Sequence, residues 1–486
     1  MIGLANRWLE KFGEAVKWLY PGLGVKRWLL LTMAGLLILL CGLFLLWTHG
    51  FINEEGTRAF LELLEGFSFH PLILVAMVFL GLFLLFWGFQ QTGNAIAGNL
   101  LPHHGRRLIE KLYSKRYLEK GPKILAIGGG TGLSVLLRGL KEYTSNITAV
   151  VTVTDDGGSS GRLRGEMGIL PPGDLRNCVL ALADTEPLLE ELFQHRFQEG
   201  NILEGHSFGN LFIAAMTEMM GFKRAILEFS KVLAIRGTVL PVTLEHIILK
   251  ARFTDGTEAE GETSIVKEGK TIERLSLSPS SCKPLPEVIS AIKEADAIIL
   301  GPGSLYTSVL PNLLVPGIKD AIKESSALCI YVCNIMTQAG ETQGFSASRH
   351  LEVFREHGCE EIIDAVIVNN DAGILPEVAE KYLLEGAELV EYDRGGLSKW
   401  GISIIQAPLL EKGGVAHHDG RKLATLIIDK LIERETGLEG FWAYTFLSLN
   451  GNYRRIKKEM NNSFPNPFNG RQIKLQRYFN SFFRSR

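Results

Sequence analysis

A glycine-rich segment in the middle of the chain is the first candidate for ligand chemistry. It follows the apolar run 124–127 and consists of Gly128, Gly129, Gly130, Thr131 and Gly132. Glycine lets the backbone approach a phosphate, a helix beginning here would add unpaired N–H groups, and Thr131 would add a hydroxyl donor. The segment lacks the Gly-Lys-Ser/Thr of a Walker A loop, and Leu133 stands where a dinucleotide fingerprint needs its third glycine. The pattern predicts a phosphate cradle, with a tight strand-to-helix turn as the alternative.

Two adjacent carboxylates end the next apolar run. Asp155 and Asp156 open the segment DDGGSSGRLR, in which Ser159, Ser160 and two arginines follow. Carboxylates at a strand end can hold ribose hydroxyls or Mg²⁺, and the serines, glycines and arginines could embrace a phosphate. The alternative is a solvated acidic turn. We therefore predict a second ligand loop, with Mg²⁺ as a candidate cofactor and no cofactor that the sequence makes certain.

Further loops place amides, hydroxyls or glycines beside apolar runs. Asn177 and Asn210 lie in the segments PPGDLRN and HSFGN, each of which opens a helix; Asp174 is a candidate N-cap in the first. The remaining candidates follow apolar strands, where an amide can read a base or sugar or can cap its own loop. They are Gly303, Ser304, Asn334 and Asn369.

The elements that must position these loops have an α/β pattern. Short apolar runs alternate with helical stretches, which implies a parallel sheet covered on both faces. In such sheets ligands bind at the carboxyl ends of the strands. Alternation around Asp255-Gly256, within 244–265, predicts an antiparallel hairpin inserted in this body. The predicted strands are 124–127, 147–153, 297–300, 327–332, 365–368 and 402–405.

The N-terminal region reads as a membrane anchor. Residues 28–48 and 71–89 contain no charged residue, and about 20 residues suffice to cross the hydrocarbon core. Both flanks are basic and the intervening loop is acidic, so we predict a two-helix transmembrane hairpin at the inner membrane with both ends cytoplasmic. The predicted division is an anchor over 1–120, a cytoplasmic ligand-binding α/β domain over 121–440, for which the family resemblance given below implies nucleotide-sugar binding, and a basic aromatic tail over 441–486.

The charge distribution limits the classes of binding partner that each region fits. The chain has 51 Lys+Arg and 53 Asp+Glu, but residues 1–120 carry +4 and residues 441–486 carry +8, which leaves −14 for 121–440. An acidic body argues against nucleic-acid binding there. The basic aromatic tail fits an anionic lipid surface, with a solvated tail or RNA contact as alternatives. Six cysteines without a CxxC pair make a zinc site or a disulfide framework improbable.

The ordered motifs together resemble one family. GGGTGLSVLLRGLK, DDGGSSGRLR, PPGDLRN, HSFGN, GPGSLYTSVLPNL and NIMTQAGETQGF resemble bacterial gluconeogenesis factors of the YvcK type, which are related to the CofD-like 2-phospho-L-lactate transferases. The resemblance covers roughly 122–435. It implies a Rossmann-like body that binds UDP-sugars, notably UDP-N-acetylglucosamine, and a link to gluconeogenic growth, cell shape and cell-wall precursor supply.

The resemblance also implies roles for individual residues. Thr131 and its glycines would lie at the diphosphate, with Asp155 and Asp156 beside them. Family members often have Arg-His-Asp where this chain has His417-His418-Asp419, so transfer of a role to His417 is doubtful.

Three functions follow from these observations. The leading one is a regulatory UDP-sugar sensor at the membrane, acting on an unidentified protein partner, with homo-oligomerisation left open and catalysis not expected. The second is a Mg²⁺-dependent transferase of the phospholactate-transferase type, in which Asp155 and Asp156 would be catalytic. The third is an NAD-binding oxidoreductase, which the missing fingerprint glycine weakens.

Overall fold

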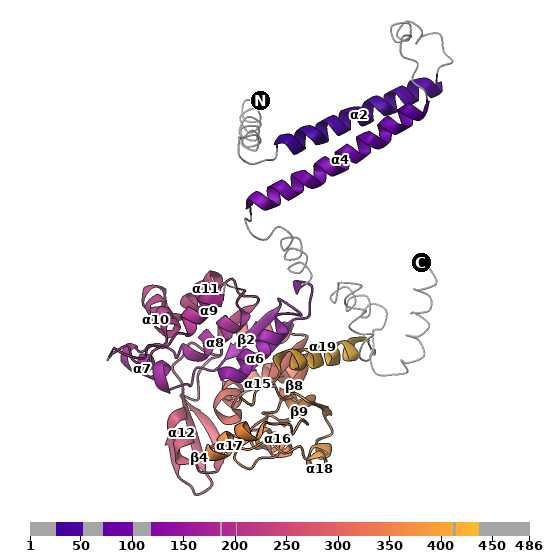
Figure 1. Ribbon diagram of the computed structural model, residues 1–486. Helices are drawn as coiled ribbons and strands as arrows, with labels where there is room; N and C mark the ends of the chain where they lie inside the picture. Colours follow the sequence, from indigo (N-terminus) through magenta and orange to yellow (C-terminus); the bar gives the residue numbers. More distant parts are fainter. Residues whose placement is uncertain are drawn as a thin grey trace. The chain divides into compact units, whose positions relative to one another are not determined.

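The computed structural model describes residues 26–51, 71–100, 118–184, 187–200, 202–411 and 415–436. The predicted loop between the apolar helices and the predicted tail over 441–486 lie outside the described residues. The chain forms two compact units, Met1–Ser114 and Lys115–Arg486, and each is treated by itself (Figure 1). The predicted three-part division stays a prediction.

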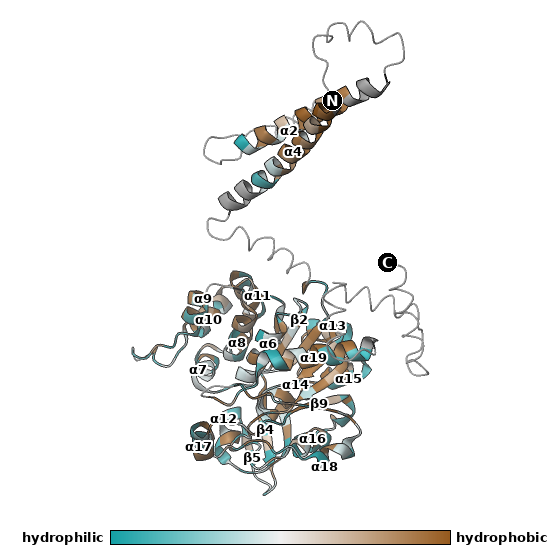
Figure 2. Cartoon of the chain, turned by 45° about the vertical axis from the view of Figure 1, so that its right-hand side comes forward, coloured by the Kyte–Doolittle hydropathy of each residue, from teal (hydrophilic) through white to brown (hydrophobic). Residues whose placement is uncertain are grey.

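The first unit consists of two long apolar helices. Helix α2 spans Lys26–Phe51 and α4 spans Pro71–Leu100. Within them, Arg27–Leu45 and Leu72–Gly93 are long and apolar enough to cross a membrane, judged by length and composition. Apolar residues predominate over the middle of both helices (Figure 2), and many are exposed; Leu30 and Phe86 are each 70% exposed. Outward apolar side chains of this number are not typical of a helix in a soluble core.

Glycines line the contact between α2 and α4. A Cβ atom on Gly35 would lie 2.5 Å from the backbone nitrogen of Leu85, and one on Gly81 would lie 2.6 Å from that of Leu39. The backbones therefore approach closely, in antiparallel order. Close approaches of the same kind occur at Gly42 and Gly88. On each helix the two glycines are seven residues apart, so they form one seam, as small residues do between membrane helices.

The second unit is built on a seven-stranded sheet in which every pairing is parallel. Its order is β10-β9-β8-β7-β1-β2-β3. Six strands confirm the prediction, whereas β3 was missed because it is short and begins at an exposed residue. The strands are β1 Ile124–Gly128, β2 Ile147–Val151, β3 Thr238–Pro241, β7 Ala297–Leu300, β8 Leu328–Val332, β9 Ala365–Asn369 and β10 Ser403–Ala407.

The strand order reverses between β1 and β7. The chain moves outward from β1 through β2 to β3, and it moves the opposite way from β7 to β10. Right-handed crossovers then place the helices of the two halves on opposite faces. Helix α6 (Gly130–Leu140) packs on α8 (Gly173–Leu182) and α19 (Gly420–Thr436), whereas α15 (Ile318–Glu324) packs on α13 (Pro286–Glu294) and α14 (Leu310–Leu314). The α/β fold is thus as predicted.

The remaining helices connect these layers. The first half contributes α7 Gly158–Met167, α9 Pro187–Gln194, α10 Phe208–Met220 and α11 Phe222–Val232. The second half contributes a π-helix at Leu305–Val309, α16 Ala347–Glu356, α17 Pro376–Leu384 and α18 Arg394–Leu397, with 3₁₀ turns at Glu360–Ile362 and Ser398–Trp400.

The predicted insertion is present between β3 and α13. Strands β4 (Ile248–Phe253) and β5 (Glu258–Glu260) form the antiparallel hairpin at Asp255-Gly256, where Gly256 has φ +81°. The insertion is larger than predicted, because α12 (Glu262–Glu268) and a third strand, β6 (Ile272–Ser278), complete it.

Both described ends of this unit lie at the amino edge of the sheet. The carbonyl of Leu118 accepts from the N–H of Ser145, just ahead of β2. In the last turn of α19, Arg434 donates to the carbonyl of Ser326, just ahead of β8. Both described ends therefore lie at the edge opposite the predicted ligand loops.

Candidate functional site

The candidate site begins where the loops after β1 and β7 touch. A Cβ atom on Gly132 would lie 2.7 Å from the carbonyl oxygen of Pro302, and one on Gly303 would lie 3.2 Å from that of Gly129. Only glycine permits the first of these contacts without a shift of backbone. The two glycine-rich segments predicted from the sequence therefore meet at the point where the strand order reverses, which is the usual ligand crevice of such sheets.

Helix α6 opens directly on this crevice. It begins at Gly130, so Thr131 and Gly132 lie in its first turn, where backbone N–H groups have no partner within the helix. Thr131 is exposed, and its hydroxyl makes no hydrogen bond within the described part of the chain. The N–H of Gly130 is already used, because it donates to the carboxylate of Asp174. The predicted cradle is thus open at Thr131 and Gly132 but closed by Asp174 at Gly130.

Asp174 corrects a prediction. It is not an N-cap: α8 has Pro172 at its N-cap, and Asp174 lies in the first turn. There its carboxylate faces the glycine loop; a Cβ atom on Gly129 would lie 2.5 Å from its Oδ2. Burial raises the pKa of Asp174 to about 6, the charge of Asp155 adds to the rise, and the N–H of Gly130 opposes it.

Two more carboxyl groups lie near Asp155 and Asp174. Burial, followed by the charges of Asp155 and Asp174, raises the pKa of Glu262 to about 9. Burial also raises the pKa of Glu341 to about 7, against hydrogen bonds from the Thr307 hydroxyl and nearby backbone N–H groups. Within the described residues, no lysine, arginine or histidine forms an ion pair with any of these four side chains. The site therefore gathers carboxyl groups that form no ion pair, and Arg176 is a cation whose charge acts on Asp174.

Asp156 and the arginines have structural partners. Asp156 Oδ1 accepts from the N–H of Thr263 at 2.9 Å and from its hydroxyl at 2.6 Å, which fixes the start of α12 to the end of β2. Arg164 donates to the carbonyls of Thr154 and Ile247, and Arg162 donates to that of Glu204. Binding of a phosphate by Arg162 and Arg164, as predicted, would therefore compete with their hydrogen bonds to these backbone carbonyls.

Ser159, Asn177 and Asn210 meet in a buried polar cluster around Arg176. Arg176 Nη1 donates to Asn210 Oδ1 at 2.7 Å, and Nη2 donates to Asn177 Oδ1 at 2.8 Å. Ser159 hydrogen-bonds to Asn210 at 3.0 Å and to His206 Nδ1 at 2.9 Å. The predicted loop at 159 and 160 is the first turn of α7, because the glycines and serines there gain these tertiary contacts.

Ser160 also has a structural partner, since its hydroxyl accepts from the N–H of Gly173 at 3.1 Å and joins α7 to α8.

The loops after β7 and β8 are joined by Gln338. It donates to the hydroxyl of Ser304 at 2.7 Å, and its Oε1 lies 3.4 Å from Asn334 Nδ2. Asn334 Oδ1 is buried without a hydrogen-bond partner, so this oxygen can accept a hydrogen bond from a ligand. Asn312, which the sequence did not single out, donates to the carbonyl of Gly128 at 3.1 Å and so fixes the end of β1.

Asn369 and the His417-His418-Asp419 segment hold local structure. Asn369 donates to the carbonyl of Asp371 at 2.8 Å and accepts from the N–H of Leu409 at 3.0 Å. His418 is buried against the carbonyl of Cys333, and burial lowers its pKa to about 4. Asp419 Oδ1 accepts from two N–H groups at the start of α19. Of these contacts, that of His418 reaches the end of β8, next to Asn334.

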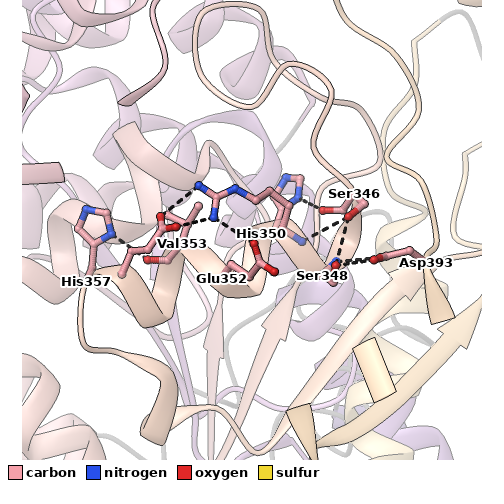
Figure 3. Close-up of polar contacts among 9 residues, drawn as sticks. Ser346, Ser348, His350, Glu352, Val353, His357 and Asp393 are labelled. Atoms are coloured by element: carbon pink, nitrogen blue, oxygen red, sulfur yellow. Dashed lines mark hydrogen bonds and ion pairs between the residues drawn. The ribbon is translucent and has the colours of Figure 1, made fainter. Parts of the chain in front are cut away.

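Helix α16 carries a separate polar network (Figure 3). Asp393 accepts from the N–H of Ser348 at 2.9 Å and from its hydroxyl, and His350 Nδ1 lies 2.8 Å from the carbonyl of Ser346. His357 Nδ1 donates to the carbonyl of Val353, while its Nε2 accepts from the N–H of Leu275 at 3.0 Å. This tautomer ties β6 of the insertion to α16, which is a structural role.

Glu262, Glu341 and Gln338 were also missed from the sequence. Glu341 and Gln338 lie inside the motif NIMTQAGETQGF, which could have indicated them as site residues. Glu262 lies in the insertion, outside every motif, so nothing in the sequence indicated it. Among the described residues, no group of three or more His, Cys, Asp or Glu side chains has an arrangement that could hold a metal ion. Mg²⁺ at Asp155 and Asp156 therefore stays a prediction.

Comparisons with known proteins agree with the motif pattern. Residues 124–410 match the model of the family described as 2-phospho-L-lactate transferase CofD. The gluconeogenesis factor of Halalkalibacterium halodurans is 52% identical over 312 residues, which cover 64% of this chain and 97% of that protein. The gluconeogenesis factor of Bacillus subtilis is 50% identical over 315 residues, 64% of this chain and 99% of that protein.

A longer relative also exists. A protein of Nostoc sp. is 47% identical over 435 residues, which cover 87% of this chain and 94% of that protein. That share leaves about 63 of the 486 residues outside the match. Because α4 begins at Pro71, the match must include it even if all the unmatched residues lie at the N-terminus.

Solved structures support the fold. The crystal structure of protein BH3568 from Bacillus halodurans matches with a TM-score of 0.62 and 52% identity, covering 63% of this chain and 99% of that one. A second crystal structure of that protein, described as a member of the UPF0052 family, matches with a TM-score of 0.61. On the family model and on these relatives, the chain belongs to the gluconeogenesis factor family, whose body is a CofD-like domain.

Proposed function

We propose that this protein is a membrane-tethered regulatory factor that binds a UDP-sugar, with UDP-N-acetylglucosamine as the ligand. The observation that carries the proposal is the contact between the glycine loops after β1 and β7, beside which the first turn of α6 presents the exposed Thr131. Free N–H groups at a helix start suit a diphosphate. The names of the relatives support a role in the control of carbon metabolism, and the motif resemblance extends this to cell shape and cell-wall supply.

The membrane tether is the second part of the proposal. Low burial of the two apolar helices and the glycine seam between them support a hairpin in the bilayer. Basic flanks around the pair favour both ends in the cytoplasm. Protease added outside intact cells should then cleave only between α2 and α4, and cleavage within 121–440 would contradict this topology.

Calorimetric titration of the full chain in detergent tests the ligand. We expect UDP-N-acetylglucosamine to bind with a 1:1 stoichiometry and NAD to give no heat of binding. The NAD alternative is disfavoured because Leu133 occupies the third fingerprint position, where a glycine is needed for close packing of helix on strand. Saturable binding of NAD, with none of the UDP-sugar, would overturn the proposal.

A transferase remains the second candidate, because the matching family model bears the name of one and because four carboxyl groups converge beside the glycine loops. Incubation with UDP-N-acetylglucosamine and Mg²⁺, followed by product analysis, separates the two functions. An unchanged nucleotide sugar after long incubation supports the sensor, whereas a new phosphorylated or glycosylated product supports the transferase.

A further inference from the structure

The insertion reaches into the candidate site through α12. Thr263, in the first turn of this helix, is hydrogen-bonded to Asp156 at the end of β2. Farther along the helix, the carbonyl of Val266 faces the loop after β8, where a Cβ atom on Gly340 would lie 2.3 Å from it. Helix α12 is therefore held between two loops of the carboxyl edge, and Glu262 begins it.

Glu262 differs from three neighbouring acids of the insertion. Glu260, Glu273 and Asp255 each form an ion pair with a lysine or arginine of the same small sheet. Glu262 forms no ion pair or hydrogen bond within the described residues, although it is only partly exposed. The groups that face it are carboxyl groups: Asp155 and Asp156 from the end of β2, Asp174 from α8 and Glu341 from the loop after β8.

A second observation also points to a ligand. Glu341 is 9% exposed, and its Oε1 accepts from the hydroxyl of Thr307 at 3.1 Å. Its Oε2 is buried without any partner. A buried oxygen left without a hydrogen bond is costly unless something else supplies one. Glu341 and Glu262 thus present unused hydrogen-bonding groups at the same site.

Charge decides which part of a nucleotide sugar fits here. Ionised carboxyl groups repel a diphosphate, and Asp174 lies at Gly130 itself, so a diphosphate at the start of α6 would lie on the side of the exposed Thr131. The sugar carries hydroxyl groups and no charge, so it can lie among carboxyl groups without repulsion. Crowding of like charges also favours a proton on Glu262, and its raised pKa agrees with this.

We propose that Glu262 contacts the sugar part of the bound nucleotide sugar, exchanging hydrogen bonds between its carboxyl group and the sugar hydroxyls. This inference rests on the proposed function and adds a residue supplied by the insertion. A carboxylic acid can donate and accept, and a glutamine amide has the same two capacities.

The test compares Glu262→Gln and Glu262→Ala in the full chain by titration with UDP-N-acetylglucosamine. We expect Glu262→Gln to stay within about threefold of the wild-type affinity and Glu262→Ala to bind about tenfold more weakly. Glu258→Ala is the matched control, because Glu258 is exposed on β5 and forms no ion pair among the described residues. Circular dichroism checks that each variant is folded, and infrared spectroscopy checks for the C=O band of a protonated carboxyl group, absent in Glu262→Gln.

The outcomes separate this inference from the proposed function. If Glu262→Ala binds UDP-N-acetylglucosamine as tightly as the wild-type protein does, the inference is overturned and the proposed function stands. Equal losses in Glu262→Gln and Glu262→Ala that appear only with Mg²⁺, not with a chelator, also overturn it and show a cation ligand instead. Absence of UDP-sugar binding by the wild-type chain overturns both.

Discussion

The body unit has two acid-rich regions that are organised in opposite ways. On the exposed sheet β5-β4-β6, acids face bases: Arg252 donates twice to Glu273, at 3.0 and 2.9 Å, and Lys270 pairs with Asp255. At the candidate site, Glu262 and Glu341 face further carboxyl groups. Hydrogen bonds from Thr257 lower the pKa of Asp255 to about 2, whereas burial raises that of Glu262 to about 9. Net charge alone would not distinguish the two regions, but the pairing does.

This difference determines how the stability of the folded protein depends on pH. A carboxyl group whose pKa is raised by folding favours the folded state below its unfolded pKa, and that stability is lost as the pH rises through the folded value. The ionisation of Asp174 and Glu341 therefore makes the unliganded protein progressively less stable as the pH rises from about 4 to the neutral range. A ligand that supplies hydrogen-bond donors to these groups restores stability, whereas the exposed ion pairs of the insertion contribute little under any condition.

The largest effect is expected where the two glycine loops touch. In Gly132→Ala the new methyl group meets the carbonyl oxygen of Pro302 at 2.7 Å, so the loops must separate. We expect UDP-sugar affinity to fall more than about 100-fold and the free energy of unfolding to fall by about 1–3 kcal/mol. Gly165→Ala in α7 is the control, because its Cβ has open space; titration and denaturant unfolding give the two readouts. Wild-type affinity in Gly132→Ala would contradict the site.

Loss of the Thr131 hydroxyl comes next. A hydrogen bond to a charged phosphate oxygen is worth about 1.5–3 kcal/mol, so Thr131→Ala should weaken UDP-sugar binding roughly 10- to 100-fold. Thr257→Ala removes a hydroxyl from the paired surface and should leave binding unchanged. Equal affinities in the two folded variants would mean that the segment 128–132 is only a tight turn.

Asp174→Asn probes the crowded carboxyl groups directly. The variant keeps an oxygen for the N–H of Gly130 but loses the charge, so the free protein at pH 8 should be more stable by about 1–2 kcal/mol. The gain should disappear on acidification through pH 6 toward pH 4, because wild-type Asp174 then takes up a proton. Thermal melts across this pH range measure the effect, and a pH-independent difference would argue against it.

The smallest effect is expected on the outer face of the insertion. Glu273→Gln breaks the paired contact with Arg252, and both side chains are about half exposed. Exposed pairs typically contribute about 0–1 kcal/mol, so stability should change by no more than that and UDP-sugar affinity should not change. A clear loss of affinity would show that the two regions are not independent.

Local patterns made much of this predictable. The glycine segments 128–132 and 301–303 stand beside apolar strands, so their place at strand ends follows from the sequence. Strand β3 was missed because four residues ending in proline carry little periodicity. Asp174 was misassigned because a residue near a helix start resembles a cap, whereas its partner, Gly130, is distant in sequence. Glu262 was missed for the same reason, since only tertiary contacts bring α12 to the site.

The position of the chain connections has a consequence for how such proteins can be assembled in evolution. The described ends of this unit, near Leu118 and Arg434, both lie at the edge of the sheet opposite the predicted ligand loops. Relatives of two lengths fit this modularity: those of Halalkalibacterium halodurans and Bacillus subtilis match almost entirely within 64% of this chain, whereas the Nostoc protein matches 87% of it, α4 included. If the proposed tether and ligand are correct, a gene fusion at that edge changes where the domain resides without a change in the loops that bind.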